Sequence, residues 1–90
     1  MKVLWVTNVP VSDSPIKGHE RSPFGGWIEA SYTALVRAGE CKLTVCAPGK
    51  SEQPVYKRGH LSDHVSIPRC DQITHFSQII DRVQPDVVHI

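Results

Sequence analysis

Two adjacent glycines followed by a tryptophan, Gly25-Gly26-Trp27, are the residues of this sequence best suited to binding a ligand. They precede an apolar pattern with helical spacing, so we expect them at the amino end of a helix. Residues without side chains let a ligand reach the backbone amides at the positive end of the helix dipole, where a diphosphate or carboxylate can bind. The pair can equally form only a tight turn, because the full Gly-x-Gly-x-x-Gly pattern of dinucleotide sites is absent.

Three positions carry further candidate ligand contacts. Asn8 follows the first apolar segment and can orient a ligand hydroxyl or cap the following loop. Trp27 can stack on a sugar ring or cover the start of the helix as part of the core. His89, in the last apolar segment, can contact substrate or serve as a structural histidine. The sequence leaves each pair of alternatives open.

Positive charge gathers between the first apolar segment and this helix, at Lys17, His19 and Arg21. These side chains can meet an anionic lipid-diphosphate acceptor or form a solvated loop. The other histidines and the cysteines lack the Cys-x-x-Cys or His-x-x-x-His spacing that places metal ligands on one element. We therefore expect no metal site among His60, His64, His75, Cys41, Cys46 and Cys70. No Gly-x-Ser-x-Gly motif indicates a serine nucleophile.

The composition is that of an ordinary soluble globular domain. The 90 residues are 40% hydrophobic and 21% charged, with a formal net charge of +1. This balance predicts a single domain over residues 1–90 and argues against nucleic-acid binding by bulk charge. The cysteines are odd in number and Cys46 lies in an apolar run, which indicates reduced thiols and a cytoplasmic location. The sequence shows no signal-peptide cleavage site and no apolar run of the roughly 20 residues that a membrane span needs.

Strands and helices must position the candidate residues, and the apolar pattern alternates between the two. A continuous apolar run predicts a buried strand from Lys2 to Thr7, and three prolines make Val9 to Phe24 a long loop. The helix that follows is expected to end at Gly39. The remaining predictions are, in order, a strand from Lys42 to Ala47, a polar connector from Lys50 to Asp63, a sheet-edge strand over Val65-Ser66-Ile67, a helix between Asp71 and Pro85, and a strand from Asp86 to Ile90.

This order of elements predicts an α/β fold, half of a Rossmann-like, doubly wound parallel sheet of about four strands. Right-handed crossovers favour the strand order 3-2-1-4 and place the two helices on opposite faces. The last strand then becomes an exposed apolar edge at Val87, Val88 and Ile90. We expect the chain to self-associate through this edge, because an unpaired strand is a template for another chain.

Three segments together resemble the amino-terminal domain of family 4 retaining glycosyltransferases. They are Lys2-Val3-Leu4-Trp5-Val6-Thr7-Asn8-Val9-Pro10, then Gly25-Gly26-Trp27-Ile28 and Pro85-Asp86-Val87-Val88-His89-Ile90. Their order and spacing cover almost the whole chain. The resemblance implies the GT-B architecture, in which an amino-terminal domain mainly holds the acceptor and a carboxy-terminal domain mainly holds the nucleotide-sugar. The active site is the cleft between the two domains.

The resemblance also implies the reaction, the transfer of a sugar from a nucleotide-sugar to a hydroxyl of a glycan or lipid-linked acceptor with retained anomeric configuration. No cofactor or obligatory metal takes part, and the implied setting is polysaccharide assembly with peripheral membrane association of the whole enzyme. Gly25 and Gly26 would lie beside the donor diphosphate and the acceptor. The family's loop after the His89 strand and the paired glutamates of its donor domain are absent from this sequence, so we expect the 90-residue chain alone to be inactive.

The competing hypothesis is a non-catalytic half-Rossmann module that assembles through its last strand. An open reading frame that continues well beyond Ile90 would favour the enzyme, whereas a stop codon there would favour the module. A flavodoxin-like receiver is disfavoured, because no acidic cluster follows the first strand.

Overall fold

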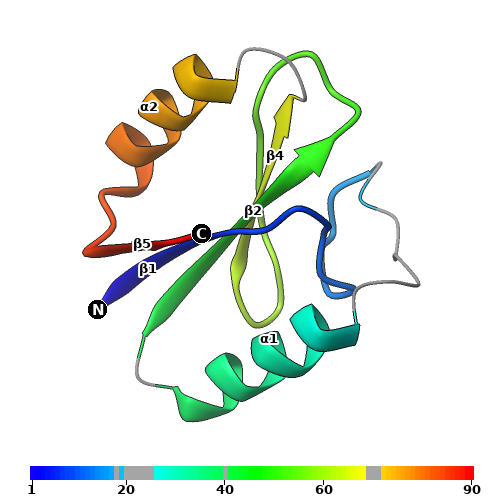
Figure 1. The fold of residues 1–90 in the computed structure, drawn as a ribbon, viewed down its shortest axis with the longest axis vertical. Coiled ribbons are helices and arrows are strands. Elements are labelled where there is room, and N and C mark those ends of the chain that lie inside the picture. Colours follow the sequence, from blue (N-terminus) through cyan, green and yellow to red (C-terminus); the bar gives the residue numbers. More distant parts are fainter. Residues whose placement is uncertain (18, 20–25, 40, 69–71) are drawn as a thin grey trace.

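The computed structural model describes all residues except 18, 20–25, 40 and 69–71. Gly25, Arg21 and Cys70 therefore lie outside the described residues. Figure 1 shows two helices on opposite sides of a twisted sheet. The elements are β1 (Lys2–Val6), α1 (Gly26–Ala38), β2 (Lys42–Gly49), β3 (Val55–Arg58), β4 (Asp63–Pro68), α2 (Gln72–Val83) and β5 (Val87–His89).

The sheet is mixed and has five strands in the order β3-β4-β2-β1-β5. β4, β2, β1 and β5 are parallel neighbours, whereas β3 pairs antiparallel with β4. The prediction of a parallel sheet of about four strands in the order 3-2-1-4 is therefore wrong in strand count and in complete order, because the polar connector contains a further strand. The α/β class is confirmed, and the four predicted strands still pair with one another in parallel.

β4 is an interior strand, not the sheet edge that the sequence predicted. Its alternate residues are buried on both faces, with Val65 and Ile67 in the core under α2 and His64 and Ser66 on the other face. β3 covers the side of β4 that was expected to be exposed. Pro68 misled the prediction, because proline is rare inside sheets, but here it occupies only the last position of the strand.

Alternation along β1 divides the apolar core between the two faces of the sheet. Leu4 packs under α2 in a cluster with Cys46, Val65, Ile67 and Ile79. Trp5 packs under α1 in a second cluster with Val11, Ile28, Tyr32, Leu43 and Val45. Successive strand residues point to opposite faces, so each face needs its own cover. One helix covers each face, as predicted (Figure 1).

Local signals mark the carboxyl ends of both helices. α1 ends at Ala38, and Gly39 follows with a φ of 65°, a left-handed conformation that glycine adopts readily. α2 ends at Val83, and Gln84 has a φ of 51° directly before Pro85. Because a proline disfavours helical geometry in the preceding residue, this end was predictable as well.

The described part of the segment between β1 and α1 contains neither helix nor strand, as its prolines predicted. It is nevertheless anchored to the protein, because Val11 and Ile16 are only 1% and 4% exposed. Val11 packs in the cluster of Trp5 and Ile28. The loop therefore contributes to the core on the α1 side.

Candidate functional site

A cavity of about 330 Å³ opens at the carboxyl ends of the parallel strands. It lies on the α2 side, because Val6, Ile67 and Phe76 of its lining also pack in the α2-side core. The carboxyl edge of a parallel sheet is where open α/β folds bind ligands. The described lining residues are Val6, Thr7, Asn8, Pro48, Ile67, Phe76 and Ile90.

Asn8 is an exposed polar residue at the mouth of this cavity. The preceding Thr7 is buried, and its Oγ1 hydroxyl donates to the carbonyl oxygen of Val9 at 2.6 Å. The Thr7 N–H donates to the carbonyl oxygen of Cys46 at 2.9 Å. Thr7 thus performs the loop capping that was one interpretation of Asn8, and Asn8 lies where its amide can contact a ligand hydroxyl.

Gly26 is the first residue of α1 and is exposed. Apart from its chain neighbours and the backbone of α1 itself, no atom of the described residues lies within 4 Å of the place where a Cβ atom would be. Trp27 is 66% exposed, so the interpretation that it covers the helix start as a core residue is wrong. An exposed indole at this position is able to stack on a ring-shaped ligand. Gly25, the other half of the predicted pair, lies outside the described residues.

His89 lies on the other face of the sheet from the cavity. It is in register with Trp5 of the α1-side core, and the two ring centroids are 6.4 Å apart with the rings tilted by 43°. This contact favours a supporting role for His89, although its side chain is exposed. The structure therefore brings Asn8 to the cavity and leaves Gly26, Trp27 and His89 outside its described lining.

The positive charge expected in the β1–α1 loop is reduced at His19. Burial lowers the pKa of His19, and the nearby backbone of Ala47 only partly offsets this. Its Nδ1 lies 2.7 Å from Ser14 Oγ. A lowered pKa favours the neutral imidazole at pH 7. Of the three predicted cations, Lys17 is exposed and Arg21 lies outside the described residues.

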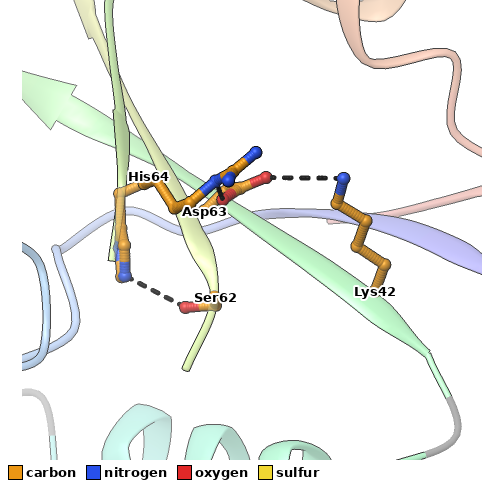
Figure 2. Close-up of polar contacts among 5 residues, drawn as sticks. Lys42, Ser62, Asp63 and His64 are labelled. Atoms are coloured by element: carbon orange, nitrogen blue, oxygen red, sulfur yellow. Dashed lines mark hydrogen bonds and ion pairs between the residues drawn. The ribbon is translucent and has the colours of Figure 1, made fainter. Parts of the chain in front are cut away.

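A chain of four polar side chains lies under α1, and the sequence analysis did not predict it. His64 Nε2 lies 3.0 Å from Ser62 Oγ (Figure 2), which lies 2.7 Å from the hydroxyl of Tyr32. Tyr32 in turn donates to Asp13 Oδ2 at 2.8 Å. Tyr32, Ser62 and His64 are all buried, so the hydrogen bonds replace contacts with water. The hydroxyl of a tyrosine at a core position of a helix needs a hydrogen-bond partner. The helical spacing of Tyr32 is therefore the sequence signal that could have indicated these hydrogen bonds.

The direction of these hydrogen bonds follows from the chemistry of the groups. The single hydroxyl hydrogen of Tyr32 goes to the carboxylate of Asp13, so Ser62 must supply the hydrogen that joins it to Tyr32. His64 must then donate to Ser62 through Nε2–H. A serine that accepts a hydrogen bond from histidine is not activated as a nucleophile. The four hydrogen-bonded side chains therefore stabilise the fold and do not form a Ser-His-Asp catalytic site.

Burial favours the neutral forms of Tyr32 and His64 and, on the other face of the sheet, of the Cys46 thiol. The pKa of Tyr32 is raised to about 12, mainly by burial; the Ser62 hydrogen bond opposes this shift and the adjacent Asp13 carboxylate adds to it. Burial also lowers the pKa of His64, against the attraction of Asp13. The pKa of Cys46 is raised to about 12 by burial alone. Since the thiolate is the reactive form of cysteine, Cys46 serves as a core residue.

Comparisons with known proteins assign no family to this chain, because no protein-family model, curated protein or solved structure matches it. In the part of the chain that the structure describes, no cluster of three or more His, Cys, Asp or Glu residues could hold a metal ion. Within the same part, neither helix has the length and apolar character needed to cross a membrane. The function must therefore be inferred from the resemblance in sequence and from the geometry at the carboxyl ends of the parallel strands, where the cavity with Asn8 lies.

Proposed function

We propose that this chain is the acceptor-side, Rossmann-like domain of a GT-B glycosyltransferase. Such an enzyme transfers a sugar from a nucleotide-sugar to a hydroxyl with retention, and the 90-residue chain alone is inactive. The observation that carries the proposal is the cavity at the carboxyl edge of the sheet, with Asn8 at its mouth. Asn8 also ends the segment in which the sequence resembles the family. Its amide can orient an acceptor hydroxyl, and Phe76 offers apolar surface to a sugar ring.

The amino end of α1 supports the proposal independently of the cavity. Gly26 has no side chain that would keep an anionic group from the backbone amides of the first helical turn, where the helix dipole is positive. The exposed indole of Trp27 lies beside it and suits a sugar. A diphosphate on these amides and a hydroxyl near Asn8 would correspond to the donor and acceptor of the proposed reaction.

The test compares the protein expressed from its complete open reading frame with the 90-residue chain. Nucleotide-sugars linked to UDP, GDP and dTDP are offered separately, and calorimetry measures their binding while released nucleoside diphosphate reports turnover. We expect the complete protein to bind at least one of them and the short chain to turn over none. The proposal fails if the complete protein ignores every nucleotide-sugar and nucleoside diphosphate.

Two variants of the complete protein sharpen this test. Asn8→Ala should raise the KM for the acceptor about three- to tenfold, the effect of one lost hydrogen bond. Trp27→Ala should weaken sugar binding by a similar factor without loss of folding, because the indole is exposed. Leu61→Ala is the matched control, since Leu61 is 54% exposed and lies outside the described cavity lining.

The second candidate function is an interaction module that assembles through β5. It is favoured by the place of β5 at one edge of the sheet, where Val87 and Val88 are 45% and 42% exposed. An edge strand presents unpaired backbone groups to another chain. A protein that binds no nucleotide-sugar, but associates in sedimentation experiments and loses this association with Val88→Lys, would favour the module over the enzyme.

A further inference from the structure

A second cavity, of about 320 Å³, lies at the opposite, amino-terminal edge of the sheet. Its described lining contains five of the ten Lys and Arg residues of the chain but only one of the nine Asp and Glu residues. The proposed function uses none of them. We call this site the basic cavity, and its charged residues are Lys2, Lys42, Lys57, Arg58, Arg82 and Asp63.

Four of the five basic residues lie on the α2 side of the sheet, where the cavity is; three of them are on strands and the fourth, Arg82, is on α2. Lys2 and Lys42 are in register on β1 and β2, and alternation places Lys2 on the α2 side with Leu4. Arg58 shares the α2 side with Tyr56 for the same reason. Lys57 alternates to the other face, where His64 is its pairing partner.

Arg82 joins these bases from the last turn of α2. Its guanidinium carbon lies 3.8 Å from the centre of the Tyr56 ring, so a cation–π contact holds the side chain at the cavity. Because α2 ends here, its dipole gives this position no attraction for an anion. Any attraction therefore comes from the side chains.

The one carboxylate in the described lining does not neutralise these cations. Asp63 Oδ2 lies 3.9 Å from Lys42 Nζ (Figure 2), and Oδ1 lies 3.9 Å from Arg58 Nε. Both distances are too long for hydrogen bonds, and exposed ion pairs of this kind contribute little. The side chains of Lys42 and Arg58 are 64% and 87% exposed, so both can also bind an incoming anion. Cations around a concave surface focus the positive potential there.

We propose that the basic cavity binds a phosphate-bearing anion, either free or as a lipid headgroup. Arginine donates paired hydrogen bonds to phosphate oxygens and lysine adds a compact charge, so the residue types fit this chemistry. The volume is at the lower end of the range for small-molecule sites, which suits a headgroup or a diphosphate. The basic cavity lies at the amino ends of the parallel strands, whereas the cavity that contains Asn8 lies at their carboxyl ends. This proposal is therefore independent of the glycosyltransferase proposal.

The test titrates the 90-residue chain with inorganic pyrophosphate by calorimetry at low ionic strength. In parallel, the chain is sedimented with phosphatidylcholine vesicles that contain or lack phosphatidic acid. Lys42→Gln and Arg58→Gln should each weaken binding about five- to tenfold, since each removes one charge at short range. Arg37→Gln is the matched control, because Arg37 is exposed on α1, on the opposite face, and should leave binding unchanged.

Asp63→Asn separates anion binding from a structural ion pair. It removes the competing carboxylate, so binding should become about fivefold tighter, whereas loss of a merely structural ion pair would leave it unchanged or weaker. Pyrophosphate binding would identify a free phosphate as the ligand, and binding only to phosphatidic acid vesicles would identify a headgroup. The proposal is overturned if neither probe binds, or if Arg37→Gln weakens binding as much as Lys42→Gln.

Discussion

The two faces of the sheet are stabilised by different chemistry. The buried cluster under α2 is wholly apolar and includes Leu4 and Ile79. The cluster under α1 is accompanied by the hydrogen-bonded chain from His64 to Asp13. Neighbouring residues of β4 serve the two faces, because His64 points to α1 and Val65 to α2. The stability of the α1 face therefore depends on protonation as well as packing, whereas that of the α2 face depends on packing.

The faces also differ in how completely they are covered. The 12 residues of α2 span about 18 Å, whereas the eight residues of β2 span about 26 Å, so the helix cannot cover the whole strand. The two cavities described above lie on this face, one at the carboxyl ends of the parallel strands and the other at their amino ends. On the α1 face, Val11 and Asp13 of the preceding loop reach the core cluster and Tyr32. The comparison indicates that, among the described residues, cavities arise where the helix is shorter than the sheet and is not joined by loop residues such as Val11 and Asp13.

The largest expected effect comes from truncating the apolar face. Ile79 is fully buried against the α2-side cluster, so Ile79→Ala should lower the free energy of unfolding by about 2–5 kcal/mol, as measured by urea denaturation. Ile80 is 40% exposed on the same helix, and Ile80→Ala should cost less than about 1 kcal/mol. Equal losses in the two variants would contradict the packing of α2 through Ile79.

A smaller effect is expected from breaking the polar chain. Tyr32→Phe keeps the ring but removes the hydroxyl between Ser62 and Asp13, which should lower the free energy of unfolding by about 1–3 kcal/mol. Tyr56→Phe is the control, because the Tyr56 ring would keep its contact with Arg82, and it should change stability by less than about 0.5 kcal/mol. If both variants were equally stable, the hydrogen-bonded chain would add nothing to the α1 face.

The smallest effect is a loss of stability on acidification. Burial lowers the pKa of His64 below its ordinary value of 6.5, so the unfolded chain binds more protons than the folded protein in acid. The contribution of His64 is fully present above pH 6.5 and is lost as the pH falls through the folded pKa, at no more than about 1.4 kcal/mol per pH unit. Urea denaturation between pH 7.5 and 5.5 measures this loss.

Two variants assign the acid sensitivity to the α1 face. His64→Gln retains an N–H donor for Ser62 but cannot titrate, so the decline should become shallower. Part of the decline should remain, because burial lowers the pKa of His19 too. The titratable neighbours that act on His64 are Asp13, His19 and Asp63. His60 is exposed, and His60→Gln should leave the decline as it is. An unchanged decline in His64→Gln would exclude His64 as its source.

The candidate site was predictable only in part. The sequence placed Asn8 at the end of β1 and a helix start at Gly26, because an apolar run and helical spacing can be recognised locally. It did not place Asn8 in a cavity with Pro48 and Phe76, which come from distant parts of the chain. It also could not decide between a stacking and a core role for Trp27, since aromatic residues beside an apolar face often pack, whereas this indole is exposed.

The sequence by itself determined the α/β class, the parallel strands and the helix ends at Gly39 and before Pro85. These features follow from strand alternation, helical spacing and the backbone preferences of glycine and proline, all of which act over a few residues. Only the tertiary structure decided the antiparallel β3, the polar chain from His64 to Asp13 and the basic cavity. Each of these joins residues from separate elements, and their meeting depends on how the whole sheet and both helices pack.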